Sequence, residues 1–175
     1  MKKTKPIVMQ TGKFIRMMTR AGWEYVERTN CTGVVIILAM TAAKRIIFIE
    51  QYRIPVNRKV IEFPAGLVND IKPKSRESFR TAAKRELLEE TGYQSEKIEL
   101  IVEGPMSSGL SADRVIVCRA SGLVKVSAGG GDDTESISVH EVPLNRAEQW
   151  LEAMRKNGRL VDPKVYMGLY FLGKK

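Results

Sequence analysis

Short apolar runs separated by polar turns follow one another along most of the chain, a pattern typical of β-strands. The longest run, residues 33–40, is continuous and rich in β-branched side chains, which predicts a strand covered on both faces. Two shorter runs before it meet at Ala21-Gly22 and predict a hairpin. The other strands expected, including the two of this hairpin, are residues 13–18, 23–29, 45–53, 98–103, 114–120 and 137–142.

A helical period replaces this pattern between about residue 75 and residue 91. Ser75 suits the start of a helix, and Gly92 suits the left-handed residue just past its end. At about 100° per residue, one face of this helix is apolar. Its members are Phe79, Ala82, Ala83 and Leu87.

Two more helices are expected near the C-terminal end. Asn145 and Glu148 form a capping signal for a helix that ends near Gly158. Asp162-Pro163 predicts the start of a last helix over residues 164–172. Strands, a helix, more strands and then helices together predict an α+β or α/β sandwich.

Length and composition are those of a globular domain. The chain has 175 residues, 43% hydrophobic and 28% charged, and no apolar run approaches the ~20 residues of a membrane span. No apolar signal-peptide core follows the basic N-terminus. Cys31 and Cys118 lie in or beside apolar runs without metal-type spacing, so we expect reduced core thiols and a cytoplasmic location.

The net charge of +9 is unevenly distributed, because residues 1–20 contain six lysines or arginines and no acid. Such a bias can indicate nucleic-acid binding, or it can favour a small polyphosphate substrate or simply keep a protein in solution. The chain shows no zinc-ligand pattern, arginine-rich helix or aromatic-basic RNA signature. We therefore do not expect a nucleic-acid partner.

Three carboxylates lie on or beside the apolar arc of the first helix. Glu86 and Glu90 are one turn apart within the arc and Glu89 lies next to them. Carboxylates so placed repel, and burying them is costly unless they are paired. A hard divalent cation such as Mg²⁺ would offset both costs. The alternative is a solvated acidic face held by Lys84 and Arg85.

The motif around these carboxylates resembles the signature of Nudix hydrolases, G-x5-E-x7-R-E-U-x-E-E-x-G-U. Glu77 and the run from Arg85 to Tyr93, RELLEETGY, agree with it at every fixed position. Gly66 precedes Glu77 by eleven residues instead of six. Five residues are therefore inserted around residues 69–74, which predicts a longer loop leading into an intact metal-binding helix.

Segments outside the motif resemble ADP-ribose pyrophosphatases and related nucleoside diphosphate sugar hydrolases, over nearly the whole chain from residue 11 onward. Ser108 stands where these enzymes have proline in a loop of the form S-P-G-x-S. The segments that carry the resemblance are EQYR at 50–53, Pro55-Val56, EFPAG at 62–66, SSGLS at 107–111, GDDTE at 131–135 and the strand pair of residues 12–14 and 23–28.

This resemblance implies the Nudix fold, in which a mixed sheet lies between helices, and metal-dependent hydrolysis of a pyrophosphate bond. It implies Mg²⁺, with Mn²⁺ as the alternative, bound by Glu86, Glu90, an assisting Glu89 and the Ala65 carbonyl oxygen. Arg85 is expected to point away from the metal face and to hold other carboxylates in place. The motif residues given structural roles are Gly66, Glu77 and Gly92.

The resemblance also implies residues for substrate binding and proton transfer. Arg28 and Arg53 are candidate phosphate contacts, although either could be an ordinary surface arginine. Trp23 is a candidate for stacking on the base, or a dimer or core residue. Leu67 is the other substrate-binding candidate. The Gly-rich acidic residues 127–134 predict a mobile loop. The resemblance implies that a carboxylate between this loop and the last strand is the general base; Glu135 is favoured, with Asp133 second.

In the related enzymes the N-terminal strands form a homodimer. The resemblance therefore divides the chain into an arm of residues 1–30, which dimerises by a swap, and a hydrolase domain of residues 31–175. Three alternatives remain open: action on GDP-mannose-type sugars, action on other nucleotides or RNA 5′ ends, and a non-catalytic nucleotide-binding domain. The last would be expected to have lost a motif glutamate, and none is missing.

Overall fold

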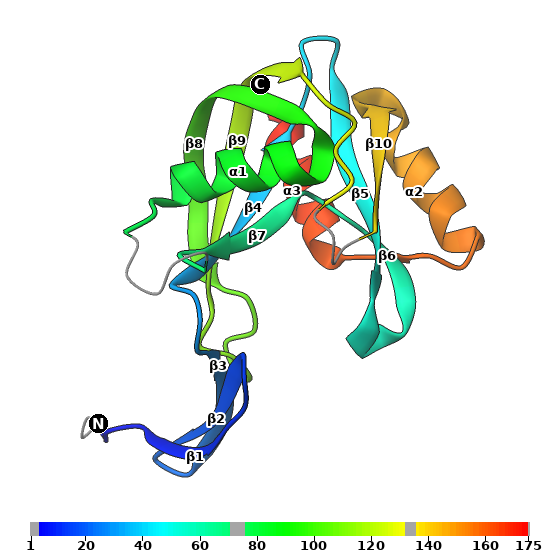
Figure 1. The fold of residues 1–175 in the computed structure, drawn as a ribbon. Coiled ribbons are helices and arrows are strands. Elements are labelled where there is room, and N and C mark those ends of the chain that lie inside the picture. The colour runs from blue at the N-terminus through cyan, green and yellow to red at the C-terminus, as the bar shows by residue number, and fades with distance from the viewer. Residues whose placement is uncertain (1–3, 71–75, 132–135, 175) are drawn as a thin grey trace.

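The computed structural model describes residues 4–70, 76–131 and 136–174. In these residues the strands form three sheets, and helices flank the two larger ones (Figure 1). The antiparallel N-terminal sheet has the order β1 (Ile7–Thr11), β2 (Ile15–Arg20), β3 (Trp23–Arg28). The second has the order β10 (Ile137–Pro143), β5 (Arg45–Arg53), β6 (Arg58–Glu62), β11 (Leu160–Val161). The third has the order β7 (Ala65–Val68), β4 (Gly33–Ala39), β9 (Arg114–Lys125), β8 (Tyr93–Pro105).

Both four-stranded sheets contain parallel and antiparallel pairs, so the expected mixed α+β architecture is confirmed. The single mixed sheet that we expected is divided in two. Strands β4 and β5 follow each other in the chain, but between them only the isolated bridge of Met40 and Ile46 is formed. Each strand instead completes its backbone hydrogen bonds with other partners, β4 with β7 and β9, and β5 with β6 and β10.

Strand β4 lies at the centre of the core and is covered on both faces, as its continuous apolar run predicts. Val35 and Ile37 point to one face, where they pack with the buried side of helix α1 (Phe79–Thr91). Ile36 and Leu38 point to the other face, which is covered by α2 (Ala147–Lys156) and α3 (Pro163–Gly173). All four side chains are buried because successive residues of a strand alternate between two packed layers.

Helix α1 begins later than the sequence pattern indicates. Ser78, not Ser75, is the N-cap, and its hydroxyl accepts a hydrogen bond from the Thr81 N–H at 3.2 Å. The end is as expected, because Gly92 adopts the left-handed conformation with φ of 74°. Of the expected apolar face, Ala82, Ala83 and Leu87 are fully buried and Phe79 is partly buried.

Several other elements differ from the pattern of apolar runs. Strands β8 and β9 extend well beyond the expected segments, and β1, β6, β7 and β11 were not expected. The predicted cap of α2 is wrong: Arg146 occupies the N-cap without a side-chain hydrogen bond. The Asp162 carboxylate does cap α3, accepting from the Lys164 N–H at 2.8 Å.

The N-terminal sheet projects from the body of the molecule (Figure 1). Ala21 and Gly22, both with positive φ, make the expected hairpin turn between β2 and β3. The sheet is tied to the loop before β9 by the Val26 N–H donating to the Leu110 carbonyl and the Ala112 N–H donating to the Val26 carbonyl. Exposed large apolar side chains gather on it: Ile7, Val8, Met9, Phe14, Ile15, Met17 and Trp23.

Both cysteines are free thiols. Cys118 is buried as expected, and burial raises its pKa to about 12. Cys31 is only partly buried, which corrects its assignment to the core. Among the described residues, no helix is long and apolar enough to cross a membrane.

Candidate active site

Two carboxylates of α1 lie against the backbone of β7. The Ala65 N–H donates to Glu90 Oε2 at 3.0 Å. Gly66 lies so near Glu86 that a Cβ atom on residue 66 would be 1.9 Å from the Glu86 carboxyl carbon. Glu90 is 2% exposed and Glu86 is largely buried. The one-turn spacing on the helix and the missing side chain at Gly66 thus bring Glu86, Glu90 and the Ala65 peptide together.

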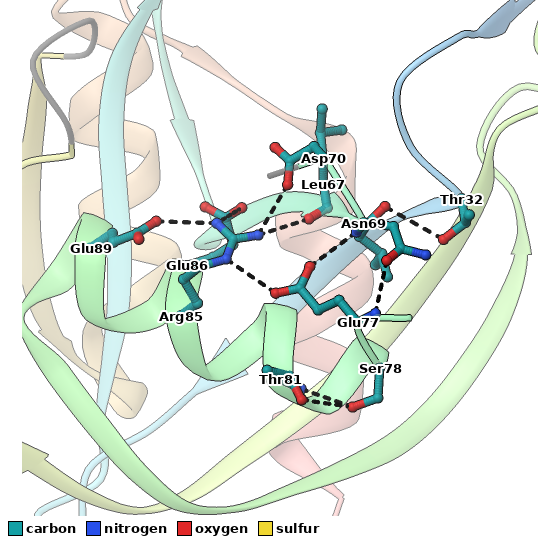
Figure 2. A network of polar contacts seen from close by, with 11 residues as sticks. Thr32, Leu67, Asn69, Asp70, Glu77, Ser78, Thr81, Arg85, Glu86 and Glu89 are labelled. Atoms are coloured by element: carbon teal, nitrogen blue, oxygen red, sulfur yellow. Dashed lines mark hydrogen bonds and ion pairs between the residues drawn. The ribbon is translucent and has the colours of Figure 1, made fainter. Parts of the chain in front are cut away.

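Arg85 is surrounded by acceptors (Figure 2). Its five N–H donors match five acceptors, which come from the helix, from β7 and from the loop between them. Nε donates to Glu77 at 3.2 Å. Nη1 donates to Glu86 at 2.8 Å and to Glu89 at 3.2 Å. Nη2 donates to the Leu67 carbonyl at 3.1 Å and to Asp70 at 3.2 Å. Arg85 therefore holds the motif carboxylates in place, as expected. It faces the site, however, and does not point away from it.

The inserted loop is closed at its base by a reciprocal pair of hydrogen bonds (Figure 2). The Asn69 N–H donates to Glu77 Oε2 at 3.0 Å, and the Glu77 N–H donates to Asn69 Oδ1 at 2.8 Å. Asn69 has a left-handed φ of 71°, which asparagine tolerates better than most residues. Because the loop closes here, Glu77 reaches Arg85 in spite of the five additional residues.

A cavity of about 340 Å³ opens beside these groups. It brings together most of the predicted site residues: Arg28, Arg53, Ala65, Gly66, Leu67, Arg85, Glu86 and Glu89. Its two other lining residues, Val34 and Asp70, were not predicted. Asp70 is adjacent to Asn69 in the insertion, which departs from the family signature, so the resemblance gave no signal for it.

The two arginines expected to contact phosphate lie on different elements and already have partners. Arg28, at the end of β3, is 3.4 Å from Asp113. Arg53, at the end of β5, donates to Glu62 at 2.7 Å. Both guanidinium groups remain about 40% exposed. They place positive charge at the wall of the cavity, whose other charged residues are the acids and Arg85. This arrangement of charges suits an anionic ligand that also contacts a cation.

The electrostatics of the carboxylates favour a bound cation. Burial raises the pKa of Glu86 to about 7, against the opposing charge and hydrogen bond of Arg85. Burial opposes the charge on Arg85 as well, but the hydrogen bond of Glu77 and the charge of Glu86 outweigh it and raise the Arg85 pKa. Four carboxylates surround one guanidinium, so the group carries a surplus of negative charge when all are ionised.

These residues fit a hard divalent cation in donor chemistry, since carboxylate and carbonyl oxygens are the ligands that such ions prefer. Among the described residues, no three acidic, histidine or cysteine side chains already converge on one point where an ion would lie. Glu86 is turned to Arg85, and Glu90 to the Ala65 N–H. A cation that binds here therefore competes with these partners for the carboxylate oxygens.

Of the predicted residues that the structure describes, Trp23, Glu77, Glu90 and Gly92 do not line the cavity. Trp23 is 64% exposed on β3, and its indole N–H donates to the Gly109 carbonyl at 2.9 Å. Glu135 and Asp133, the candidate bases, lie outside the described residues.

The described part of the glycine-rich segment is anchored, which differs from the mobile loop expected there. The Gly130 N–H donates to the Glu90 carbonyl at 2.9 Å, and the Gly131 N–H to the Glu89 carbonyl at 3.1 Å. Gly129, Gly130 and Gly131 all have positive φ. Gly130 and Gly131 thus satisfy two carbonyl groups at the C-terminal end of α1, which a helix leaves without internal partners.

Comparison with known proteins agrees with this geometry. The profile of the NUDIX domain matches residues 30–164. The chain is 33% identical over 141 residues to the methanol dehydrogenase activator of Bacillus methanolicus, covering 80% of this chain and 71% of that protein. It is 35% identical over 144 residues to the ADP-ribose pyrophosphatase of Bacillus subtilis (strain 168), covering 82% of this chain and 73% of that protein. It is 29% identical over 157 residues to the GDP-mannose pyrophosphatase of Escherichia coli (strain K12), covering 85% of this chain and 76% of that protein.

A solved structure described as an ADP compounds hydrolase shares the fold. Its TM-score is 0.69 at 19% sequence identity, covering 96% of this chain and 89% of that one. Glu86, Glu89, Gly66 and Arg85 line the cavity, and Glu77 and Glu90 are bonded to Arg85 and to the Ala65 N–H beside it. The chain therefore belongs to the Nudix family of hydrolases.

Proposed function

We propose that this protein hydrolyses the pyrophosphate bond of a nucleoside diphosphate sugar such as ADP-ribose, giving a nucleoside monophosphate and a sugar phosphate. The observation that carries the proposal is the cavity that is lined by both Arg28 and Arg53 and by Glu86 and Glu89. Such a cavity offers guanidinium groups for phosphate oxygens and carboxylates for a metal. The pyrophosphatases among its relatives support the choice of substrate class.

Nudix hydrolases generally use divalent metal ions, and we propose Mg²⁺ for this one, with Mn²⁺ as the alternative. Glu86, Glu90 and the Ala65 carbonyl oxygen would hold it, assisted by Glu89. A bound divalent ion neutralises phosphate charge and lowers the pKa of bound water. Arg85 keeps the carboxylates aligned, and Arg28 and Arg53 hold the two phosphates so that attack on phosphorus is in line.

For the general base we propose Glu135, with Asp133 as the second choice. The helix carboxylates serve as metal ligands and are poor proton acceptors in that role. The support comes from the two ends of the segment that carries the candidates. Gly131 is bonded to Glu89 of α1, and the Ile137 N–H donates to the Gly130 carbonyl at 3.1 Å. Both ends of the segment thus lie beside the catalytic helix.

We also propose a cytoplasmic homodimer that is formed through the N-terminal sheet. This sheet carries exposed apolar side chains that a partner would cover, including Phe14 at 54% and Trp23 at 64% exposed. A swapped arm would place Trp23 at the partner's cavity, where its ring would stack on the base.

A substrate panel tests the proposed function. With Mg²⁺ and with Mn²⁺, nucleoside monophosphate release would be measured from ADP-ribose, GDP-mannose, other nucleotide sugars, dinucleoside polyphosphates and capped RNA. We expect the highest kcat/KM for a nucleoside diphosphate sugar. Preference for capped RNA, with binding that falls steeply with salt, would contradict the proposal. Binding of nucleotides without turnover of any compound would indicate a non-catalytic domain.

A further inference from the structure

Asp70 belongs to the insertion that distinguishes this chain from the family signature, yet it lines the catalytic cavity. Its carboxylate is 26% exposed and accepts from Arg85 Nη2 at 3.2 Å (Figure 2). The clamp between Asn69 and Glu77 fixes the residue just before it. Asp70 is therefore an additional acid at the site, held where it meets the arginine that organises the motif.

The two ends of the Arg85 guanidinium have different partners. Nη1 donates to Glu86 and Glu89, which are two of the acids proposed to hold the metal. Nη2 donates to Asp70 and to the Leu67 carbonyl, neither of which is a proposed ligand. When Glu86 turns from Arg85 to a cation, Nη1 loses its shortest contact while Nη2 keeps both of its acceptors.

The strength with which Arg85 competes for Glu86 depends on its other partners. A guanidinium that has lost the charge of one carboxylate is left less neutralised, and it attracts the remaining carboxylates more strongly in a partly buried site. Loss of the Asp70 carboxylate would therefore make Arg85 attract Glu86 and Glu89 more strongly. It would also remove a negative charge from the neighbourhood of the cation, so both effects weaken metal binding.

We propose that Asp70 is a positioning residue for metal binding: by holding Nη2 of Arg85, it allows Glu86 to exchange the guanidinium for a divalent cation. This inference rests on the proposed function, because it requires Glu86 to be a metal ligand. It assigns to the insertion a task that the rest of the family signature does not supply.

The test measures Mn²⁺ binding directly, in the absence of substrate, from the free-ion signal in electron paramagnetic resonance. The variants are Asp70→Asn, which keeps the shape and removes the charge, and Asp70→Glu, which restores it. Glu152→Gln on α2 is the control, since it removes one acid from a surface ion pair remote in sequence from the motif. We expect Asp70→Asn to weaken Mn²⁺ binding by about five- to tenfold. Asp70→Glu should remain within about twofold of the wild type, and Glu152→Gln should have no effect.

Two further measurements separate positioning from other roles. The melting temperature of Asp70→Asn should equal that of the wild type, so that weaker Mn²⁺ binding does not come from loss of folding. In an Arg85→Gln background, Asp70→Asn should weaken Mn²⁺ binding clearly less than it does in the wild type, because only the direct effect of its charge remains. An equal loss in both backgrounds would show a direct effect of charge and overturn the positioning role.

The remaining outcomes are also decisive. Unchanged Mn²⁺ binding by Asp70→Asn, or equal weakening by Glu152→Gln, would overturn the inference while the proposed function stands. Absence of Mn²⁺ binding by the wild-type protein would instead refute the proposed metal site, and this inference with it.

Discussion

Gly66 and Glu86 are in such close contact that residue 66 has no room for a side chain. A Cβ atom there would lie 1.9 Å from the carboxyl carbon of Glu86 and 2.0 Å from its Oε1. The backbone φ of Gly66 is not positive, so strain is not the reason for glycine here. The reason is space: the carboxylate lies against the strand that carries the Ala65 carbonyl.

Gly66→Ala should therefore displace Glu86 and lower kcat by about 100-fold or more, since small misplacements of catalytic groups have effects of this size. Gly104→Ala on β8 is the matched control, because a Cβ atom there meets nothing within 4 Å. Steady-state kinetics and circular dichroism of both variants provide the check. Normal turnover by Gly66→Ala would mean that the position of Glu86 is unimportant.

Glu86→Gln and Glu90→Gln should each lower kcat by about 100-fold or more while the protein stays folded, because each removes charge from the proposed metal site. Glu90→Gln should also lower the melting temperature, since the Glu90 carboxylate is buried and bonded to the Ala65 N–H. Glu86→Gln should cost less stability or none, because a carboxylate whose pKa is raised by burial is not stabilised by its surroundings. Near-normal kcat in either variant would refute the assignment of the site.

Glu135→Gln should lower kcat strongly and leave Mn²⁺ binding unchanged, because a general base acts on the proton of the attacking water and does not hold the metal. Asp133→Asn should have a smaller effect. The measurements are single-turnover hydrolysis and metal titration. If both single variants and the double variant keep the wild-type kcat, the base must be sought among the carboxylates of α1.

Phe14→Glu should convert a dimer to a monomer, because it places a charge on the apolar surface of the N-terminal sheet. Tyr170→Glu on α3 is the control: Tyr170 has a similar exposure, 59% against 54%, but lies on the body of the protein. Light scattering at micromolar concentration measures the mass of each. A wild-type monomer at this concentration would contradict the proposed dimer.

Removal of residues 1–29 should reduce activity as well as assembly, because it also removes Trp23 and Arg28.

Glu50 makes the stability of the fold sensitive to acid. It is 5% exposed and lies 3.2 Å from Lys59, 3.2 Å from His140 and 3.5 Å from Arg159. Burial opposes its charge, but the hydrogen bond and charge of Lys59, with help from His140 and Arg159, lower the net pKa of Glu50. Its ionised form therefore stabilises the fold above the unfolded-chain pKa of about 4.3, and this contribution is lost as pH falls through the lower folded value.

Glu50→Gln should thus lower the free energy of unfolding by about 2 kcal/mol at pH 7, because it leaves cations around a buried neutral group. The difference from the wild type should narrow below about pH 4. Urea unfolding between pH 7 and pH 3.5 measures this, with Glu152→Gln as the control for an exposed ion pair. A difference that stays constant over this range would show that the charge of Glu50 is not responsible.

The sequence alone determined the features that depend on near neighbours in the chain. The helical period defined the apolar face of α1, and the one-turn spacing placed Glu86 and Glu90 on the same side. The continuous β-branched run predicted that β4 is covered on both faces. These predictions succeed because the geometry of a helix or strand relates residues a few positions apart whatever surrounds them.

Tertiary structure decided which distant residues share a cavity and where the first helix begins. The sequence pattern placed that start at Ser75, whereas Ser78 is the N-cap of α1. Short strands such as β6 and β7 form because partners elsewhere in the chain offer them hydrogen bonds, a condition that their own residues do not encode. The contact between Asp70 and Arg85 likewise depends on other parts of the chain and is not encoded by the neighbouring residues. The distance between them is set by how the inserted loop closes, which depends on contacts between Asn69 and Glu77 that no local period describes.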